Sequence, residues 1–101
     1  MITQIVLQRY AKGSMIGMRS TATPIRQLIE RGLSEGHDIA INFTGVEVTQ
    51  SFVDELLGAI ILRRGPQVMR HVILRGCSDT TKSIIKFITH DRADQFLSAV
   101  H

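Results

Sequence analysis

The chain has 101 residues, 44% of them hydrophobic, which is enough for one compact core and too few for a second domain. Its longest uninterrupted apolar run, residues 59–62, is far shorter than the roughly 20 residues of a membrane-spanning helix. The net charge of +3 is mildly basic, and the single cysteine, Cys77, has no partner for an internal disulfide. With no secretory signal pattern at the N-terminus, we expect one cytoplasmic domain over residues 1–101, with no membrane contact.

The chain begins with a predicted β-hairpin. Residues 2–8 are rich in β-branched and aliphatic side chains, as strands are. Residues 12–14 have the composition of a turn, and residues 15–19 can return as the second strand.

A helix is predicted over residues 21–36. Ser20 or Thr23 can serve as its N-cap, Pro24 suits a first turn, and Gly36 is a typical end. Apolar residues recur at helical spacing and predict one buried face. They are Ile25, Leu28, Ile29 and Leu33.

The next element is a predicted buried strand over residues 38–43. Ile39, Ile41 and Phe43 share one face of it. Ala40 keeps the opposite face partly apolar, so both faces of this strand are expected to be covered.

A second helix is predicted from Ser51 to Arg64, ended by Gly65 and Pro66. Its apolar stripe consists of Val53, Leu56, Leu57 and Ile60. Ser51 and Asp54 form a variant capping box at its start. Phe52 and Leu62 lie off the stripe. If both are exposed, they form an apolar patch suited to a partner or a homodimer mate. If the helix lies between two layers, both are buried instead.

The last predicted elements are a strand over residues 71–75 and a helix capped by Ser78 or Asp79. The inward stripe of this helix is expected to consist of Ile84, Phe87 and Ile88. A second stripe consists of Ala93, Phe96, Leu97 and Val100. The stripes are out of phase, which predicts a kink or break across residues 89–91. The alternation of strands and helices predicts an α/β fold with a mixed sheet and flanking helices.

Charges are unevenly distributed along the chain. Residues 32–62 contain five carboxylates and no lysine or arginine, whereas residues 56–78 contain four arginines and no carboxylate. We therefore predict a two-toned surface with a basic edge. This edge consists of Arg63, Arg64, Arg70 and Arg75.

The central segment, residues 38–57, contains a strand ending in Asn-Phe-Thr-Gly-Val, then Ser51-Phe52 and the acidic pair Asp54-Glu55. It resembles the core of the bacterial STAS-like domain of unknown function, a group similar to the anti-sigma factor antagonists of the STAS superfamily. Residues that also fit, before the first helix, are Gly13, Gly17, Arg19 and Ser20. The resemblance implies a sheet of four to five strands with flanking helices and a partner-binding surface around Ser51. That surface would consist of Glu47, Thr49, Gln50, Ser51, Phe52, Asp54 and Glu55.

The resemblance also implies a regulatory role. In anti-sigma factor antagonists, a partner kinase related to the histidine-kinase ATPases phosphorylates a serine at this helix start, which releases the complex. Ser51 corresponds to that serine by position and is a candidate phosphoacceptor; the alternative is a capping role alone. Antagonists typically have an acidic residue before the serine and Ser-Gly after it, whereas Gln50 precedes Ser51 here and Phe52-Val53 follow it. We therefore expect a module that docks on a histidine-kinase-like ATPase or another signalling protein, with phosphorylation as the weaker expectation.

Catalytic and metal sites are not indicated. The histidines, His37, His71, His90 and His101, match no chelating spacing, and we expect no metal or cofactor. The serines and Cys77 lack a nucleophile motif, and Cys77 is expected to be a small buried residue. Asp54 and Glu55 are adjacent on a helix, so their side chains should point in different directions and not work as an acid/base pair.

Nucleic-acid binding is the alternative function, through the basic edge with Lys82 and Lys86 beyond it. The chain has only five aromatic residues and no tryptophan, so platforms for base stacking are scarce. A basic edge that helps select an acidic protein partner is therefore the preferred interpretation.

Overall fold

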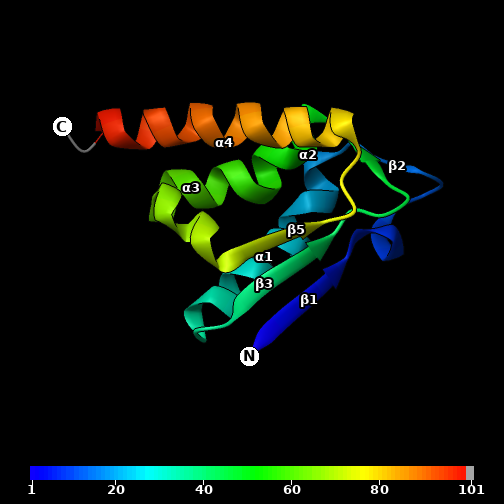
Figure 1. The fold of residues 1–101 in the computed structure, drawn as a ribbon, viewed down its shortest axis with the longest axis horizontal. Coiled ribbons are helices and arrows are strands. Elements are labelled where there is room, and N and C mark those ends of the chain that lie inside the picture. The colour runs from blue at the N-terminus through cyan, green and yellow to red at the C-terminus, as the bar shows by residue number, and fades with distance from the viewer. Residues whose placement is uncertain (100–101) are drawn as a thin grey trace.

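A computed structural model describes residues 1–99 of the chain; Val100 of the second predicted stripe and His101 lie outside the described residues. The elements, labelled in Figure 1, are β1 (Ile2–Val6), the 3₁₀ helix η1 (Leu7–Tyr10), β2 (Met15–Ile16), α1 (Arg19–Ser34), β3 (Asp38–Asn42), β4 (Glu47–Val48), α2 (Gln50–Val53), the π-helical turn η2 (Asp54–Gly58), α3 (Ala59–Arg64), the 3₁₀ helix η3 (Pro66–His71), β5 (Val72–Arg75) and α4 (Asp79–Ala99). No helix among the described residues is long and apolar enough to cross a bilayer.

The five strands form two separate sheets. Strands β1, β3 and β5 form a three-stranded parallel sheet in the order β1-β3-β5, and β2 pairs with β4 in a two-stranded parallel sheet. The α/β class is confirmed, but the prediction of one mixed sheet of four to five strands is wrong, since the strands divide three and two.

The predicted N-terminal hairpin is also wrong. β1 pairs with β3 and β2 with β4, and only the isolated bridge between Lys12 and Met15 is antiparallel. The strand stops at Val6, because the chain turns through η1 with Leu7 fully buried. After this turn, residues 15–16 lie beyond the carboxyl edge of the main sheet, where they pair with β4.

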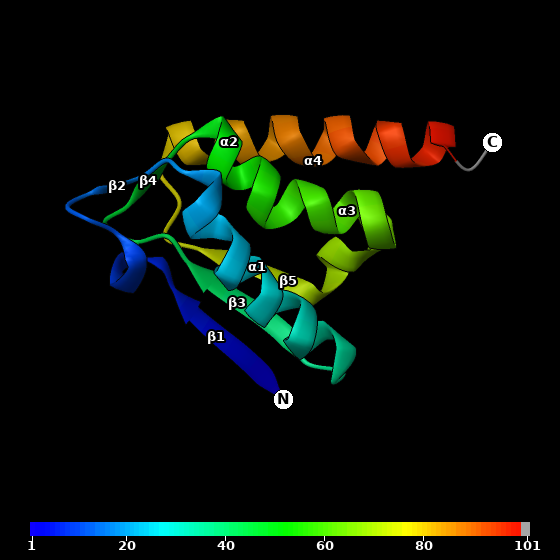
Figure 2. The ribbon, with the colours of Figure 1, turned by 180° about the vertical axis from the view of Figure 1, so that it is seen from behind.

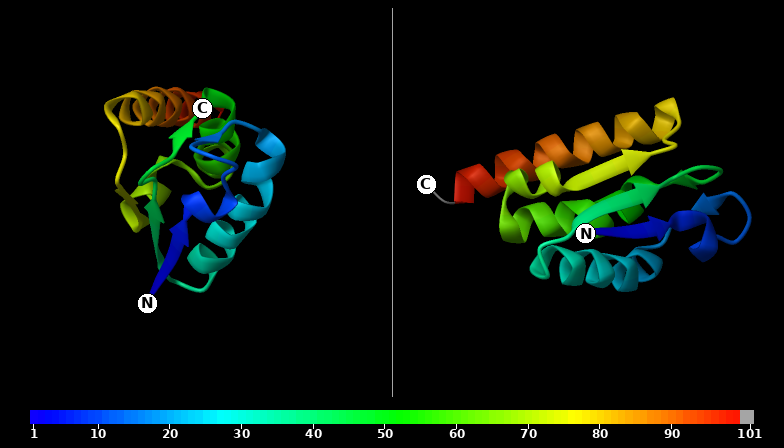
Figure 3. Two further views of the ribbon diagram at one scale, coloured as in Figure 1. Left: turned by 90° about the vertical axis from the view of Figure 1, so that its right-hand side faces the viewer. Right: turned by 60° about the horizontal axis from the view of Figure 1, so that its bottom comes forward.

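The helices cover one face of the three-stranded sheet. The right-hand view of Figure 3 shows the strands in front, with the helices behind or beside them, and Figure 2 shows α1 and α3 on the other side. Ile39, Ile41 and Phe43 point toward the helices and are fully buried, as predicted. On the opposite face, Ala40 lies in register between Gln4 and Ile73, and no element of the described chain covers this row. The predicted burial of β3 is confirmed at its centre, where Ile39, Ala40 and Ile41 are all buried. On the open face, the neighbouring Gln4 and Ile73 are exposed.

Helix α1 begins earlier than predicted. It starts at Arg19, and its N-cap, Met18, makes no side-chain cap, so neither Ser20 nor Thr23 caps this helix. Pro24 lies inside the helix. It is the sixth residue of the helix, so the prediction that it lies in the first turn is wrong, and it cannot donate the hydrogen bond that the Ser20 carbonyl would otherwise accept.

The buried face of α1 is shifted relative to the predicted one. Leu28 is exposed, and Gly32 lies on the sheet, where a β-carbon would meet Ile39 Cδ1 at 2.7 Å and Thr3 Oγ1 at 2.8 Å. The glycine lets the helix backbone approach the strands closely. The helix ends before Gly36, as predicted, with φ of +80° at that glycine.

Helix α4 is continuous, so the predicted break across residues 89–91 is wrong. Its cap is confirmed, because Ser78 Oγ accepts a hydrogen bond from the Thr81 N–H at 3.1 Å. Thr89 Oγ1 donates to the Ile85 carbonyl at 2.8 Å within the unbroken helix. The second predicted stripe is only partly buried: Ala93 and Phe96 are half-buried and Leu97 is exposed. The helix therefore runs on without the break that would turn this stripe inward. The buried residues of α4 are Thr81, Ile85 and Ile88.

Candidate partner-binding surface

The loop between β3 and β4 sets the approach to α2. Asn42 Oδ1 accepts a hydrogen bond from the Thr44 N–H at 2.9 Å, and the Val46 N–H donates to the Phe43 carbonyl at 3.0 Å. Gly45 has φ of +75°, a conformation that glycine adopts without strain. This tight turn brings the chain back to pair with β2 and directs it into the helix.

Thr49, not Ser51, caps the start of α2. Its Oγ1 accepts a hydrogen bond from the Phe52 N–H at 3.1 Å and donates one to the Gly17 carbonyl at 2.7 Å. The cap therefore also ties the helix start to the segment before α1. The predicted capping box of Ser51 and Asp54 is wrong, and Ser51 lies exposed in the first turn of the helix.

Phe52 is fully buried and cannot contact a partner directly. The helix from Gln50 to Arg64 lies between α1 and α4, so it packs apolar side chains against a neighbour on each side. Leu62 is exposed near the other end of this helix, on the order of 15 Å away along the axis. Of the two alternatives for Phe52, burial between layers is thus confirmed, and no joint patch with Leu62 exists.

The carboxylate of Asp54 is held by two arginines. Arg92 Nε lies 2.8 Å from Asp54 Oδ1, and Arg19 Nη1 lies 2.9 Å from Oδ2. Burial by itself would raise the pKa of Asp54, but the hydrogen bonds from Arg92 and Arg19 outweigh burial and lower it. The same contact raises the pKa of Arg92. Arg92 also pairs with Asp91.

The π turn η2 makes room for this arrangement. The Ala59 N–H donates to the Asp54 carbonyl, five residues back, where an α-helix would use a residue four back. Gly58 lies under α4, and a β-carbon there would approach Asp54 Oδ1 at 2.5 Å and Arg92 Cγ at 3.2 Å. The glycine and the π turn therefore allow α4 to lie directly against the helix from α2 to α3.

Glu55 is also bound within the fold. Arg26 Nε lies 3.2 Å from Glu55 Oε2, and Thr23 Oγ1 donates to the same oxygen at 3.2 Å. Arg19 reaches both acidic residues, since its Nη1 is 3.9 Å from Glu55 Oε1. Apart from this shared arginine, the two carboxylates point in different directions, as predicted: Asp54 toward Arg92 of α4 and Glu55 toward Arg26 of α1. Both carboxylates are paired internally, so they are poorly placed to bind a partner.

One exposed side chain at the start of α2, Gln50, faces α4. Gln50, Ser83, Ile84 and Phe87 line a shallow pocket of about 380 Å³, which we call the α2–α4 groove. Phe87 is 56% exposed. Glu47 and Thr49 are half-buried beside this region, and Glu47 Oε1 accepts a hydrogen bond from Ser78 Oγ at 2.9 Å.

Phe87 is the site residue that sequence reasoning placed wrongly. It was expected to face inward with Ile84 and Ile88, whereas the buried stripe runs through Thr81, Ile85 and Ile88. The spacing of four and three residues in that stripe would have indicated the outward position of Phe87, but a threonine is not counted as apolar.

The predicted basic edge is divided. Arg63 Nη1 lies 3.1 Å from Glu30 Oε1, and Arg64 donates to Ser34 Oγ at 3.0 Å. Arg70 is exposed in η3, before β5, whereas Arg75 is exposed at the carboxyl end of that strand. The four arginines therefore do not form one continuous cationic surface, and two of them are engaged by α1.

The three histidines within residues 1–99 make different contacts. His37 Nδ1 hydrogen-bonds with Thr3 Oγ1 at 2.9 Å, and His71 Nδ1 lies 3.1 Å from Asp38 Oδ1. His90 is exposed on α4. Within residues 1–99, no three metal-binding side chains gather in one place. Cys77 is half-buried, not buried as expected, and desolvation raises the pKa of its thiol although Lys82 opposes this.

Comparison with known protein families gives one match. The model of a STAS-like domain of unknown function matches residues 21–82. This range contains every residue of the predicted partner-binding surface, whereas Gly13, Gly17, Arg19 and Ser20 precede it. Neither the curated proteins nor the solved structures include a match to this chain.

Proposed function

Because the chain belongs to the family of STAS-like domains of unknown function, we propose that it is a non-catalytic regulatory module that docks on a signalling protein. The observation that carries this proposal is the α2–α4 groove, an apolar hollow beside the helix start that the antagonist resemblance associates with partner binding. We propose a histidine-kinase-like ATPase, or a signalling protein of similar type, as the partner.

The groove has the composition of a small protein-binding site. Exposed aromatic side chains act as anchors in protein interfaces, and polar residues at the rim add hydrogen bonds. Phe87 and Ile84 supply the apolar part, while Gln50 and Ser83 supply amide and hydroxyl groups. Ser83 lies one helical turn before Phe87 and Asp91 one turn after it, so this face of α4 changes from apolar to charged along its length.

Phosphorylation of Ser51 is a finer part of the proposal. The hydroxyl is exposed in the first helical turn, and a phosphoryl group there would add about −1.5 to −2 charges next to Gln50, which lines the groove. The nearby carboxylate of Asp54 is already balanced by two arginines. The new charge would therefore act mainly on the partner, and we expect Ser51→Glu to weaken docking while Ser51→Ala preserves it.

A capture experiment tests the proposal. Tagged wild-type protein is used to isolate partners from the native host, in parallel with Phe87→Asp and with Leu97→Asp as the control. Leu97 is 48% exposed on the same helix but outside the groove, so both variants should fold alike. We expect a defined signalling protein to be captured by wild type and Leu97→Asp and lost with Phe87→Asp. Equal capture by all three proteins would exclude the groove as the docking site.

Phe87 is chosen for this test because substitutions of buried residues in the neighbouring helix, from Gln50 to Arg64, would not test docking. Phe52 and Leu56 are both fully buried, and an aspartate at either position would unfold the domain. Intact mass of the protein from its native host, with Ser51→Ala as the comparison, tests the phosphorylation separately.

A further inference from the structure

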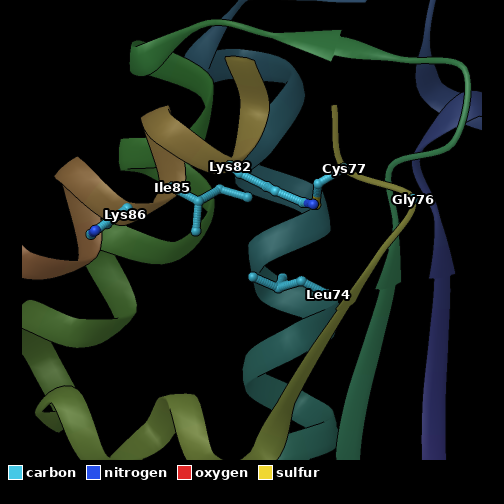
Figure 4. A pocket seen from close by; sticks show the side chains of 6 residues that line it. All are labelled: Leu74, Gly76, Cys77, Lys82, Ile85 and Lys86. Carbon is cyan, nitrogen blue, oxygen red and sulfur yellow. The ribbon is translucent and has the colours of Figure 1, made fainter. Parts of the chain in front are cut away.

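A second pocket, separate from the α2–α4 groove, opens between β5 and the first half of α4. Its volume is about 440 Å³, within the range of small-ligand sites. Its lining consists of Leu74, Gly76, Cys77, Lys82, Ile85 and Lys86. Figure 4 shows Lys82 extending from α4 with its amine beside Cys77, and Leu74 on the facing strand.

The backbone that forms the edge of this pocket leaves no room for a larger residue. Gly76 has φ of +70°, and a β-carbon on it would lie 2.1 Å from Thr44 Oγ1 and 3.0 Å from Asn42 Oδ1. The chain can therefore bend closely past the end of β3 before it enters α4. This places the pocket at the carboxyl end of the parallel strands, where open α/β sheets commonly bind ligands.

The charged side chains that line the pocket are of one sign. The chain has three lysines, and two of them, Lys82 and Lys86, line this pocket. Within residues 1–99 neither lysine has a carboxylate at ion-pair distance, whereas Arg19, Arg26 and Arg92 are all paired. The pocket also adjoins the amino-terminal half of a 21-residue helix, whose dipole adds to the attraction of anions.

The base of the pocket is apolar. Leu74 and Ile85 contribute aliphatic side chains from the strand and the helix, and Cys77 is half-buried beside the amine of Lys82. We propose that this pocket binds a small organic anion, with the anionic group at Lys82 and Lys86 and an aliphatic part on Leu74 and Ile85. This inference does not depend on the proposed function, because its residues do not line the α2–α4 groove.

Cys77 is a built-in reporter for such binding, because it is the only thiol of the chain. The rate of its alkylation by iodoacetamide, a neutral reagent, is measured by intact mass with increasing octanoate. Octanoate supplies a carboxylate and an aliphatic tail, while octan-1-ol supplies only the tail and inorganic phosphate only an anion. We expect octanoate to slow alkylation saturably, with a roughly millimolar Kd as befits a small ligand in an open pocket, and octan-1-ol and phosphate to have clearly weaker effects.

The variants Lys82→Met plus Lys86→Met and, as a control, Lys12→Met each alter exposed lysines and should leave the fold intact. The double variant should bind octanoate about tenfold more weakly, as expected for the loss of two exposed charge contacts, and Lys12→Met should bind it like wild type. Amide NMR spectra check folding and should show octanoate-induced shifts at residues 76, 77, 82 and 85. Absence of saturable protection, equal protection by octan-1-ol or by phosphate, or unchanged octanoate binding by the double variant would each overturn the proposal.

Discussion

The helix from Gln50 to Arg64 and helix α4 border the same groove, yet they contribute to it in opposite ways. The first helix lies between two neighbours and buries nearly every large apolar side chain, including Phe52, and its acidic pair binds arginines. Helix α4 covers it from outside and exposes Phe87. The segment around Ser51, which carries the family resemblance, therefore has mainly structural roles. Helix α4, which covers it, presents the apolar surface.

The largest expected difference between the two helices is the effect of removing one phenylalanine from each. Phe52→Ala should lower the free energy of unfolding by about 3–5 kcal/mol, because it leaves a cavity in the core. Phe87→Ala should change it by less than about 1 kcal/mol, since the side chain is largely in water. Urea denaturation measures both values, and similar losses for the two variants would contradict the assignment of inside and outside.

The link between the two helices can be tested at Asp54. Asp54→Asn should lower the free energy of unfolding by about 2 kcal/mol, because Arg92 and Arg19 would lose the charge that they neutralise in a partly buried site. Asp94→Asn on the exposed side of α4 is the matched control and should have little effect. Equal stability of the two variants would mean that the Asp54 ion pairs do not hold α4 in place.

The same carboxylate predicts a pH dependence. The pKa of Asp54 is lowered in the folded chain, so its stabilising contribution is complete above the unfolded-state pKa of about 3.9 and is lost as the pH falls through the lower folded-state value. Between about pH 5 and pH 2, wild type should therefore lose more stability than Asp54→Asn. Parallel stability curves for the two proteins over this range would argue against the lowered pKa.

At the helix start, the smallest expected effect separates Thr49 from Ser51. Thr49→Ala should cost about 1 kcal/mol, because the Phe52 N–H and the Gly17 carbonyl both lose a partner. Ser51→Ala should be nearly neutral for folding, since that hydroxyl is exposed and does not cap the helix. A larger loss for Ser51→Ala than for Thr49→Ala in thermal unfolding would restore the predicted capping box.

Local patterns in the sequence predicted the elements well but not their partners. The alternation around Ile41 and the glycines at residues 36 and 65 place β3 and the ends of two helices correctly. Strand pairing depends on contacts between distant segments, so the hairpin-like turn at residues 12–14 was misleading.

The exposed surface was harder still to predict. Whether Phe52 or Phe87 faces solvent depends on which helix lies in the middle layer, and Asp54 is paired with a residue 38 positions later. Neither the order of the helix layers nor this long-range ion pair produces a pattern in the local sequence. The family resemblance supplied the region of interest, and the packing of α4 was needed to identify which side chains in it are free.

The most direct test of the account is to map where a captured signalling partner touches this chain by amide hydrogen exchange. Docking in the α2–α4 groove predicts that the partner slows exchange around Gln50 and Ser51 and at residues 83–87, with little change at residues 93–97. Protection confined to the uncovered sheet face, in the strands that carry Gln4, Ala40 and Ile73, would contradict it.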